Sequence, residues 1–143
     1  HNPISTEGAG DSGQVLARLE LPEPKTGEEI ELPLEKLSTK KGTSVVYQLR
    51  FPKIGRYELV FRMSSTLGSL AQLPISVFLN NTLQQTVTIN GTEGKVVEHA
   101  VTLAIRQDGE KYMKLYFGES SIDMHRMFLR YAGQNDIESF RNE

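Results

Sequence analysis

Short stretches of alternating apolar and polar residues, separated by turn residues about every 8–12 positions, limit the fold of this chain most strongly. In RYELVFRM, Tyr57, Leu59 and Phe61 would share one face of a strand. Glu58 and Arg62 would share the other face, which is the period of a half-buried β-strand. The pattern recurs along most of the chain, and no 3.6-residue helical period is sustained before the C-terminal end. The sequence therefore predicts an all-β fold.

About nine strands are predicted. They cover residues 14–21, 28–34, 43–51, 56–63, 73–79, 82–89, 95–105, 111–117 and 121–131. Three chain reversals between them are typical of hairpins: PKIG at 52–55, the pair Asn80 and Asn81, and RQDGE at 106–110. We expect two antiparallel sheets packed face to face in a β-sandwich of the jelly-roll type. The residues expected in its core include Val46, Leu49, Tyr57, Leu59, Phe61, Val77, Leu79, Leu103, Leu115, Phe117, Met124, Met127 and Leu129.

Length and composition bound the domain organisation and exclude several functions. The 143 residues fit one domain, which we expect to span 14–143 after a Gly- and Ser-rich tail or linker at 1–13. Lys and Arg number 16 against 18 Asp and Glu, and their even spread offers no basic face for nucleic acid. Apolar runs are strand-sized, so no membrane span is expected. The chain has no Cys, which excludes disulfides and thiol nucleophiles but leaves the compartment open.

Several segments between Val45 and Tyr131 follow one another in the order of a known kind of β-sandwich. SVVYQLRFPKIGRYELVFRMSS reads as a strand, a short Pro-containing turn, Gly-x-Tyr and a strand ending in Arg. ISVFLNNTLQQTVTI is a hairpin, and VTLAIRQDGEKYMKLYF with SIDMHRMFLRY reads as a final hairpin and closing strand. Together they resemble the jelly-roll carbohydrate-binding modules of families six and thirty-five. The resemblance implies a non-catalytic accessory module of a secreted, periplasmic or cell-surface glycan-degrading enzyme.

The resemblance also implies where a glycan would bind, namely in loops at one end of the sandwich. The implied ligand-binding residues are Arg62, Ser64, Ser65, Glu98, Ser121, Asp123 and His125. Such modules usually stack a sugar ring on Trp or Tyr. This chain has no Trp, and the segment before VTLAI offers only Val96 and Val97. Hydrogen bonds of about 0.5–1.5 kcal/mol each would then carry the binding, which predicts dissociation constants from high micromolar to millimolar.

A structural calcium ion often accompanies these modules. Carboxylates of Glu20, Glu31 and Asp123 could supply the hard oxygen ligands that calcium prefers. Exposed glutamates on strands are usually solvated, so the same residues also fit an ordinary surface. The three histidines are too scattered along the chain to suggest a metal triad.

Two other functions stay open beside glycan binding: a structural spacer or packing domain of a larger extracellular glycan-active enzyme, and a protein-interaction sandwich. Asp123, His125 and Arg126 form the densest polar group inside an apolar strand, but alternation alone would also place such residues on a solvated face. No nucleophile with a base, Gly-rich phosphate loop or spaced carboxylate pair is recognisable in the sequence. The sequence therefore predicts a protein that is not an enzyme.

Overall fold

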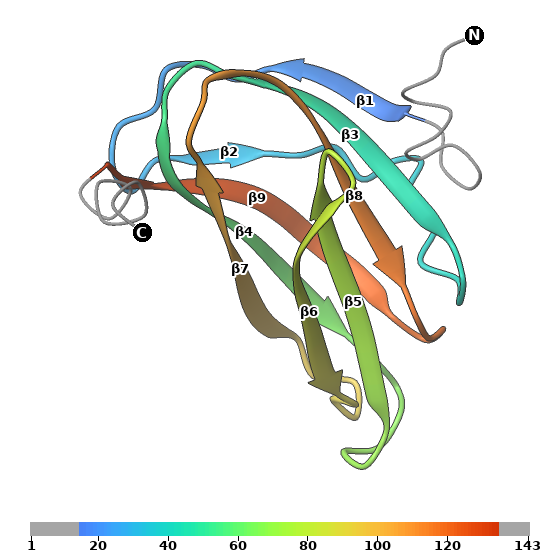
Figure 1. The fold of residues 1–143 in the computed structure, drawn as a ribbon. Coiled ribbons are helices and arrows are strands. Elements are labelled where there is room, and N and C mark those ends of the chain that lie inside the picture. Colours follow the sequence, from blue (N-terminus) through green and yellow to red (C-terminus); the bar gives the residue numbers. More distant parts are fainter. Residues whose placement is uncertain (1–14, 135–143) are drawn as a thin grey trace, which may run out of the picture.

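The computed structural model describes residues 15–134 and contains all nine predicted strands (Figure 1). They are β1 (Val15–Glu20), β2 (Glu29–Glu31), β3 (Ser44–Phe51), β4 (Gly55–Ser64), β5 (Gln72–Leu79), β6 (Thr82–Asn90), β7 (Val97–Ile105), β8 (Gly109–Phe117) and β9 (Asp123–Gly133). Within this range no helix is long and apolar enough to cross a membrane. The predicted tail and the last nine residues of the predicted domain, 135–143, lie outside the described residues.

The strands form a β-sandwich of two sheets. One sheet has the order β1-β3-β8-β5-β6 and the other the order β2-β9-β4-β7, which confirms the predicted fold class. The strand pairs are antiparallel with one exception, because β1 runs parallel to β3. Between these two strands the chain visits the other sheet to form β2, and a crossover of this kind is what parallel pairing needs.

One of the three predicted hairpins is confirmed. β5 pairs with β6 through Asn80 (φ 47°) and Asn81 (φ 72°), which both adopt the left-handed conformation of a tight turn. The hairpins predicted at PKIG and RQDGE are wrong, because β3 and β4 lie in different sheets, as do β7 and β8. A turn between two alternating stretches predicts a chain reversal, and it does not tell whether the chain stays in one sheet or crosses to the other.

The connection at 52–54, which leads from β3 across to β4, is held by buried tyrosines. The hydroxyl of Tyr57 donates to the carbonyl oxygen of Lys53 at 2.8 Å, and that of Tyr131 donates to the carbonyl oxygen of Ile54 at 2.9 Å. Gly55 follows with φ 144°, and a Cβ atom there would lie 2.5 Å from the Tyr131 hydroxyl. We call residues 52–55 with these two tyrosines the arch.

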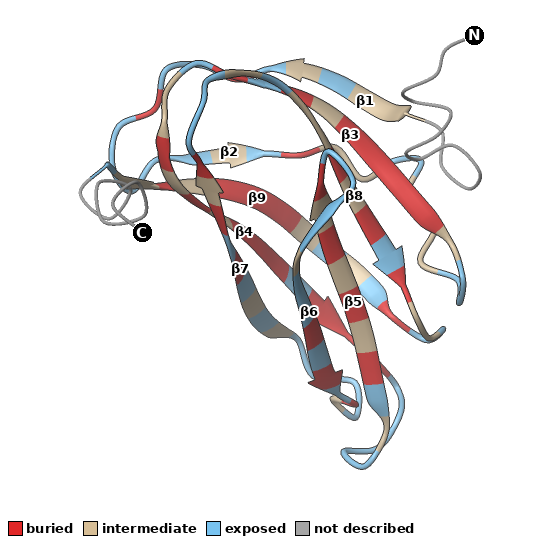
Figure 2. Ribbon diagram, in the orientation of Figure 1, coloured by how far each residue is buried: buried red, intermediate tan, exposed pale blue. Residues whose placement is uncertain are grey.

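The core lies between the two sheets, and Figure 2 shows buried residues concentrated on the central strands. Nearly all predicted core residues belong to it. Met124 is partly buried and packs against the core. Val46 is fully buried but lies outside the core cluster, opposite Val15 of β1 and Lys114 of β8, because strand alternation turns Val45 and Tyr47 inward instead.

Candidate functional site

A β-bulge near the start of β9 orients part of the predicted site. The register joins Arg62 to Arg126 and Met63 to Met124, so His125 is an extra residue in β9. Bulges of this kind redirect side chains next to functional surfaces. The Nε2 atom of His125 consequently lies 2.7 Å from the Oγ atom of Ser64, on the side of β4 that faces away from the core.

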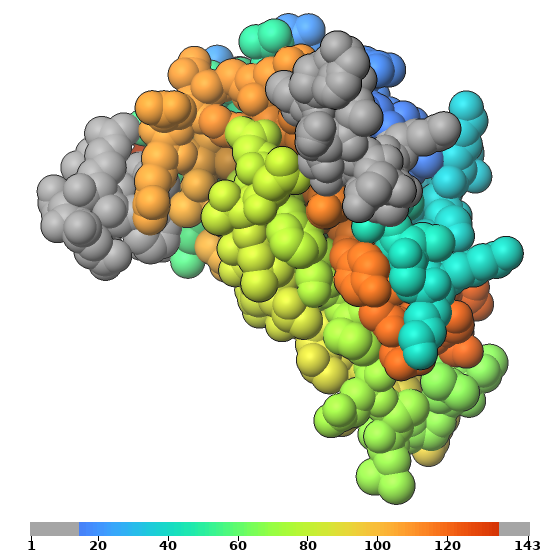
Figure 3. Space-filling view, turned by 45° about the vertical axis from the view of Figure 1, so that its right-hand side comes forward, coloured from blue at the N-terminus to red at the C-terminus, as the bar shows by residue number. Residues whose placement is uncertain are grey.

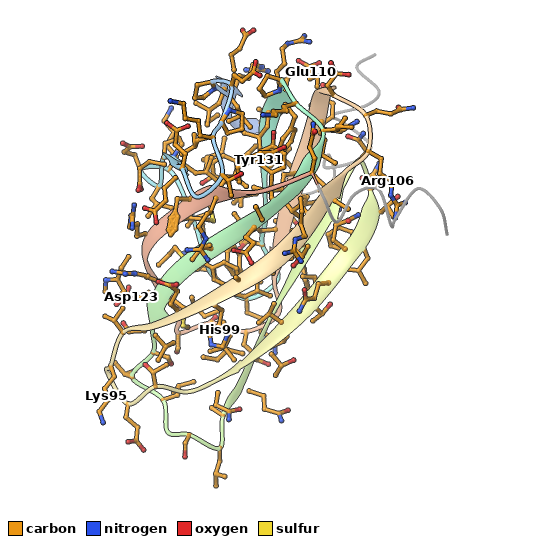
Figure 4. The ribbon with its side chains drawn as sticks, turned by 90° about the vertical axis from the view of Figure 1, so that its left-hand side faces the viewer. Lys95, His99, Arg106, Glu110, Asp123 and Tyr131 are labelled. Atoms are coloured by element: carbon orange, nitrogen blue, oxygen red, sulfur yellow. The ribbon has the colours of Figure 1, made fainter. Side chains whose placement is uncertain are left out.

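Five of the predicted ligand-binding residues come together at one end of the four-stranded sheet. The register places Arg62 beside Glu98 and Ser64 beside Asp123. Arg62 Nε donates to Glu98 Oε1 at 3.0 Å, and His125 contacts Ser64. We call Arg62, Ser64, Glu98, Asp123 and His125 the sheet-end cluster. In Figure 4, Asp123 and Lys95 mark this end of the molecule, away from Arg106 and Glu110.

The cluster offers groups that recognise hydroxyls. Asp123 is exposed, and its carboxylate forms no side-chain hydrogen bond or ion pair with other residues in the range 15–134. An ionised carboxylate can accept several hydrogen bonds, while a guanidinium such as that of Arg62 donates them. The exposed imidazole of His125 can do either through its two ring nitrogens. Together these groups can hydrogen-bond neighbouring hydroxyls of a polyol.

The contact between Ser64 and His125 is a nucleophile–base pair that the sequence did not reveal. Acyl transfer by such a pair also needs a group that orients the base and donors for the developing oxyanion. The contact seen for the His125 ring in the described part of the chain is the one from Nε2 to Ser64, and nothing orients Nδ1 there. Within the described residues the pair is thus a polar contact between β4 and β9.

Ser65 and Ser121 do not join the sheet-end cluster. Ser65 is 3% exposed, its Oγ accepts from the Leu67 amide at 3.1 Å, and its own amide donates to Thr92 Oγ1 at 2.8 Å. The bond to Thr92 holds the connection at 65–71 against that at 91–96. Ser121 is exposed in the β8–β9 connection with φ 74°. Ser65 thus has a structural role, and Ser121 lies at the margin of the cluster.

The connections 65–71, 91–96 and 118–122, which we call the loop end, adjoin the cluster, and backbone hydrogen bonds join the first two of them. The amides of Gly91, Glu93 and Gly94 donate to carbonyl oxygens of the 65–71 connection at 2.7–3.0 Å. The arrangement leaves apolar side chains exposed, with Leu70 at 97% and Val96 at 55%. Aliphatic side chains therefore stand where the sequence lacks an aromatic platform.

The three predicted calcium ligands are not brought together. Glu31 lies on β2, and both it and Glu29 accept hydrogen bonds from Arg126, whose pKa these bonds raise further. Glu20 lies on the other sheet, opposite Arg50, and Asp123 lies at the sheet end. Within residues 15–134 no group of three or more His, Cys, Asp or Glu side chains is placed to hold a metal ion.

An aromatic side chain outside the predicted site is also accessible. Tyr116 is 40% exposed on the outer face of the five-stranded sheet, and its register neighbours are Ser44 and Ser76. By default a tyrosine on a strand is expected to place a half-buried ring against the core with its hydroxyl in water. The alternation in KYMKLYF contains the missing signal, because Met113 and Leu115 face the core and so turn Tyr116 outward.

Comparisons with known proteins relate this fold to carbohydrate-binding modules. No protein-family model matches the chain. A β-glucosidase from Ruminococcus albus is 28% identical over 102 residues, which are 71% of this chain and 11% of that enzyme. The chain thus spans about a tenth of this relative.

Two solved modules match along most of their length. A family 35 carbohydrate-binding module from an environmental isolate superposes with a TM-score of 0.54 and 16% identity, covering 85% of this chain and 83% of that one. The module CBM6cm-2 from Cellvibrio mixtus lichenase 5A, solved with cellotriose, gives a TM-score of 0.51 and 13% identity, covering 75% and 88%. The fold predicted from the resemblance is therefore confirmed: this chain has the jelly-roll fold of carbohydrate-binding modules of families six and thirty-five.

Proposed function

We propose that this chain is a non-catalytic glycan-binding module that belongs to a larger glycan-active protein. The observation that carries the proposal is the sheet-end cluster, in which a guanidinium and a hydroxyl from β4 meet an imidazole and a carboxylate from β9, and this carboxylate has no partner among residues 15–134. The fold supports it, and so does the likeness to about a tenth of a β-glucosidase, which suggests a catalytic domain in the same parent chain. Such a protein would act outside the cytoplasm, in a secreted, periplasmic or cell-surface setting.

Recognition in this proposal rests on hydrogen bonds. Asp123 accepts from sugar hydroxyls, and Arg62 and His125 complete the polar contacts. Exposed Val96 and Leu70 supply apolar contact beside them. Each hydrogen bond replaces one to water and contributes about 0.5–1.5 kcal/mol, so a single sugar would bind with a dissociation constant from high micromolar to millimolar.

A structural spacer is the second candidate function. The observation that favours it is the aliphatic character of the loop end, where Leu70 and Val96 stand exposed in place of an aromatic ring. A spacer would keep the fold and bind no glycan. If the chain is instead a protein-interaction sandwich, we also expect no glycan binding, together with binding to a protein partner.

A glycan array followed by calorimetry tests the proposal. We expect at least one plant, host or microbial glycan to bind, and Asp123→Ala to abolish that binding without unfolding the protein. Asp108→Ala is the matched control, because Asp108 is also exposed but lies in the β7–β8 connection. If the folded chain binds no glycan on the array, the spacer function is favoured. Equal binding by Asp123→Ala and the parent would remove the sheet-end cluster from the proposal.

A further inference from the structure

We infer that the protein has a second binding site, for a small anionic ligand that also carries hydroxyl groups. The site is a surface cavity of about 400 Å³ between the β5–β6 turn and the end of β7. Its polar lining residues are Asn80, Thr82, Gln84, Arg106, Gln107 and Lys111. Figure 4 shows Arg106 far from Asp123, and Figure 3 shows the yellow-green β5–β6 segment against the orange β7–β8 segment. The cavity is therefore separate from the sheet-end cluster.

The sandwich opens at this point because two edge strands meet there. β6 ends the order of the five-stranded sheet and β7 that of the four-stranded sheet. The wall formed by the β5–β6 turn is fixed, since the Asn80 amide donates to the Tyr112 carbonyl oxygen at 2.9 Å and Asn80 Oδ1 accepts from the Tyr112 amide at 2.9 Å. Gln84 is held as well, through a hydrogen bond from Nε2 to the Thr82 carbonyl oxygen at 3.0 Å. The β5–β6 side of the cavity is thus held in place by the protein's own hydrogen bonds.

Lys111 occupies a position where strand alternation calls for an apolar residue. Met113, Leu115 and Phe117 follow it at every second position of β8 and are fully buried in the core. A lysine in such a row extends its chain along apolar surface towards the nearest opening and keeps its ammonium group in water. For Lys111 that opening is the cavity, which its side chain lines. Within the described residues Lys111 takes part in no ion pair.

The lining selects an anion. Among residues 15–134 it contains two cationic side chains, Arg106 and Lys111, and no Asp or Glu. The carboxylate of neighbouring Glu110 is turned to the outer face of the five-stranded sheet, where it accepts from Gln48. Amides of Asn80, Gln84 and Gln107 can bond hydroxyls in both directions. The described part of the chain contributes no aromatic ring to the lining on which a neutral sugar could stack, so the charge must supply the affinity.

The size of the cavity fits one small molecule, because small-molecule sites span about 300–1,000 Å³. The chemistry common to the candidate ligands is a carboxylate or phosphate group on a polyhydroxylated ring. Free glucuronate and glucose 6-phosphate are probes for the two kinds of anion. Glucose tests the ring without a charge, and inorganic phosphate tests the charge without a ring.

Heteronuclear NMR on the full chain tests the inference, because side-chain amides give resolved signals. We expect glucuronate or glucose 6-phosphate to shift the side-chain amide signals of Asn80, Gln84 and Gln107, and glucose to shift none of them. Lys111→Gln and Arg106→Gln should each weaken this binding about tenfold, and raising the salt concentration should weaken it as well. Lys114→Gln is the matched control, because Lys114 lies on the same strand but contacts the Phe78 ring on the outer face.

The outcomes separate the two anions and can overturn the site. Binding of glucuronate alone assigns a carboxylate ligand, and binding of glucose 6-phosphate alone assigns a phosphate ligand. The inference fails if neither probe shifts the amide signals of the cavity, if glucose or inorganic phosphate alone shifts them as strongly, or if Lys111→Gln binds like Lys114→Gln. Asp123→Ala should leave these shifts unchanged, so the site stands or falls independently of the proposed function.

Discussion

The arch and the loop end solve the same problem, a chain that must leave one strand and reach another, in opposite ways. In the arch, side chains hold the backbone: the hydroxyls of Tyr57 and Tyr131 donate to backbone carbonyl oxygens, and both rings are buried. At the loop end the backbone holds itself, through amide-to-carbonyl bonds between the connections at 65–71 and 91–96. Side chains such as Leu70 and Val96 are therefore left in solvent.

The difference shows which part of the molecule is free to bind a ligand. A side chain that stabilises the arch cannot change without cost, because its removal takes a hydrogen-bond donor from a backbone carbonyl oxygen of the connection. An exposed side chain at the loop end, such as that of Leu70, carries little of the folding free energy, so it can be chosen for recognition. Four predictions test this contrast through the free energy of unfolding.

The largest effect is expected for Gly55→Ala in the arch. The new Cβ atom would lie 2.5 Å from the Tyr131 hydroxyl and 2.8 Å from the Gly133 carbonyl oxygen, at a φ of 144° that side chains rarely adopt. We expect a loss of at least about 3 kcal/mol in urea unfolding. Gly109→Ala is the control, since φ is 113° there but no atom lies within 4 Å of the new Cβ, and strain alone should cost about 1–2 kcal/mol. Equal losses for both would mean that the arch is not tightly packed.

The second effect concerns the backbone contacts of the loop end. In Gly91→Ala the Cβ atom would lie 2.2 Å from the Gly68 carbonyl oxygen and would push the two connections apart. We expect a loss of about 2–3 kcal/mol in the same assay. Gly68→Ala makes the same substitution in the facing connection with open space around it, and should cost less than about 1 kcal/mol. A mild effect of Gly91→Ala would contradict a loop end fixed by its backbone.

The third effect is that of one arch hydroxyl. Tyr57→Phe removes the bond to the Lys53 carbonyl oxygen and should cost about 1 kcal/mol at pH 7. Burial, with the nearby Tyr131 and Glu23, raises the pKa of Tyr57 above its usual value of about 10. The stability linked to this higher pKa is fully present below about pH 10 and is lost as the pH rises further, because the unfolded chain releases its proton first.

Urea unfolding between pH 8 and 11 measures this linkage. The parent should lose more stability above pH 10 than Tyr57→Phe does, because the variant has no phenol to ionise at this position. Tyr112→Phe serves as the control, because Tyr112 is only partly buried on β8. Parallel curves for the parent and Tyr57→Phe would contradict the raised pKa.

The smallest effect is expected for Leu70→Asn at the loop end. This side chain is 97% exposed, so its replacement should change the free energy of unfolding by less than about 0.5 kcal/mol. Thermal and urea unfolding both measure it. A loss above 1 kcal/mol would show that the loop end depends on its side chains, as the arch does.

Alternation predicted the strands well, because it follows directly from which face of each strand is buried. It did not predict which sheet each strand joins, since PKIG and RQDGE carry turn residues whether the chain stays in a sheet or crosses between sheets. In SIDMHRMFLRY the core residues Met124 and Met127 are three positions apart, which breaks the two-residue period. That break was a readable signal of the bulge that turns His125 towards Ser64.

The predicted site was only partly accessible to sequence reasoning. Arg62 lies on β4, and Asp123 and His125 lie on β9, which the fold joins to it. Their positions at strand ends were visible in the pattern. The roles of Glu31 and Ser65 depend on partners distant in the sequence, Arg126 and Thr92, which no local pattern reveals. Lys111 was visible in the local sequence, because it lies at the same two-residue spacing as the buried residues of its own strand, where an apolar residue is expected.

The most direct test of this account is NMR mapping of a glycan that binds the isolated chain. We predict that the largest shift changes fall on Ser64, Glu98 and Asp123 and on the neighbouring residues of the loop end, with the arch residues unchanged. Shift changes centred instead on Tyr116 and the outer face of the five-stranded sheet, with the sheet-end cluster silent, would contradict the proposed glycan site.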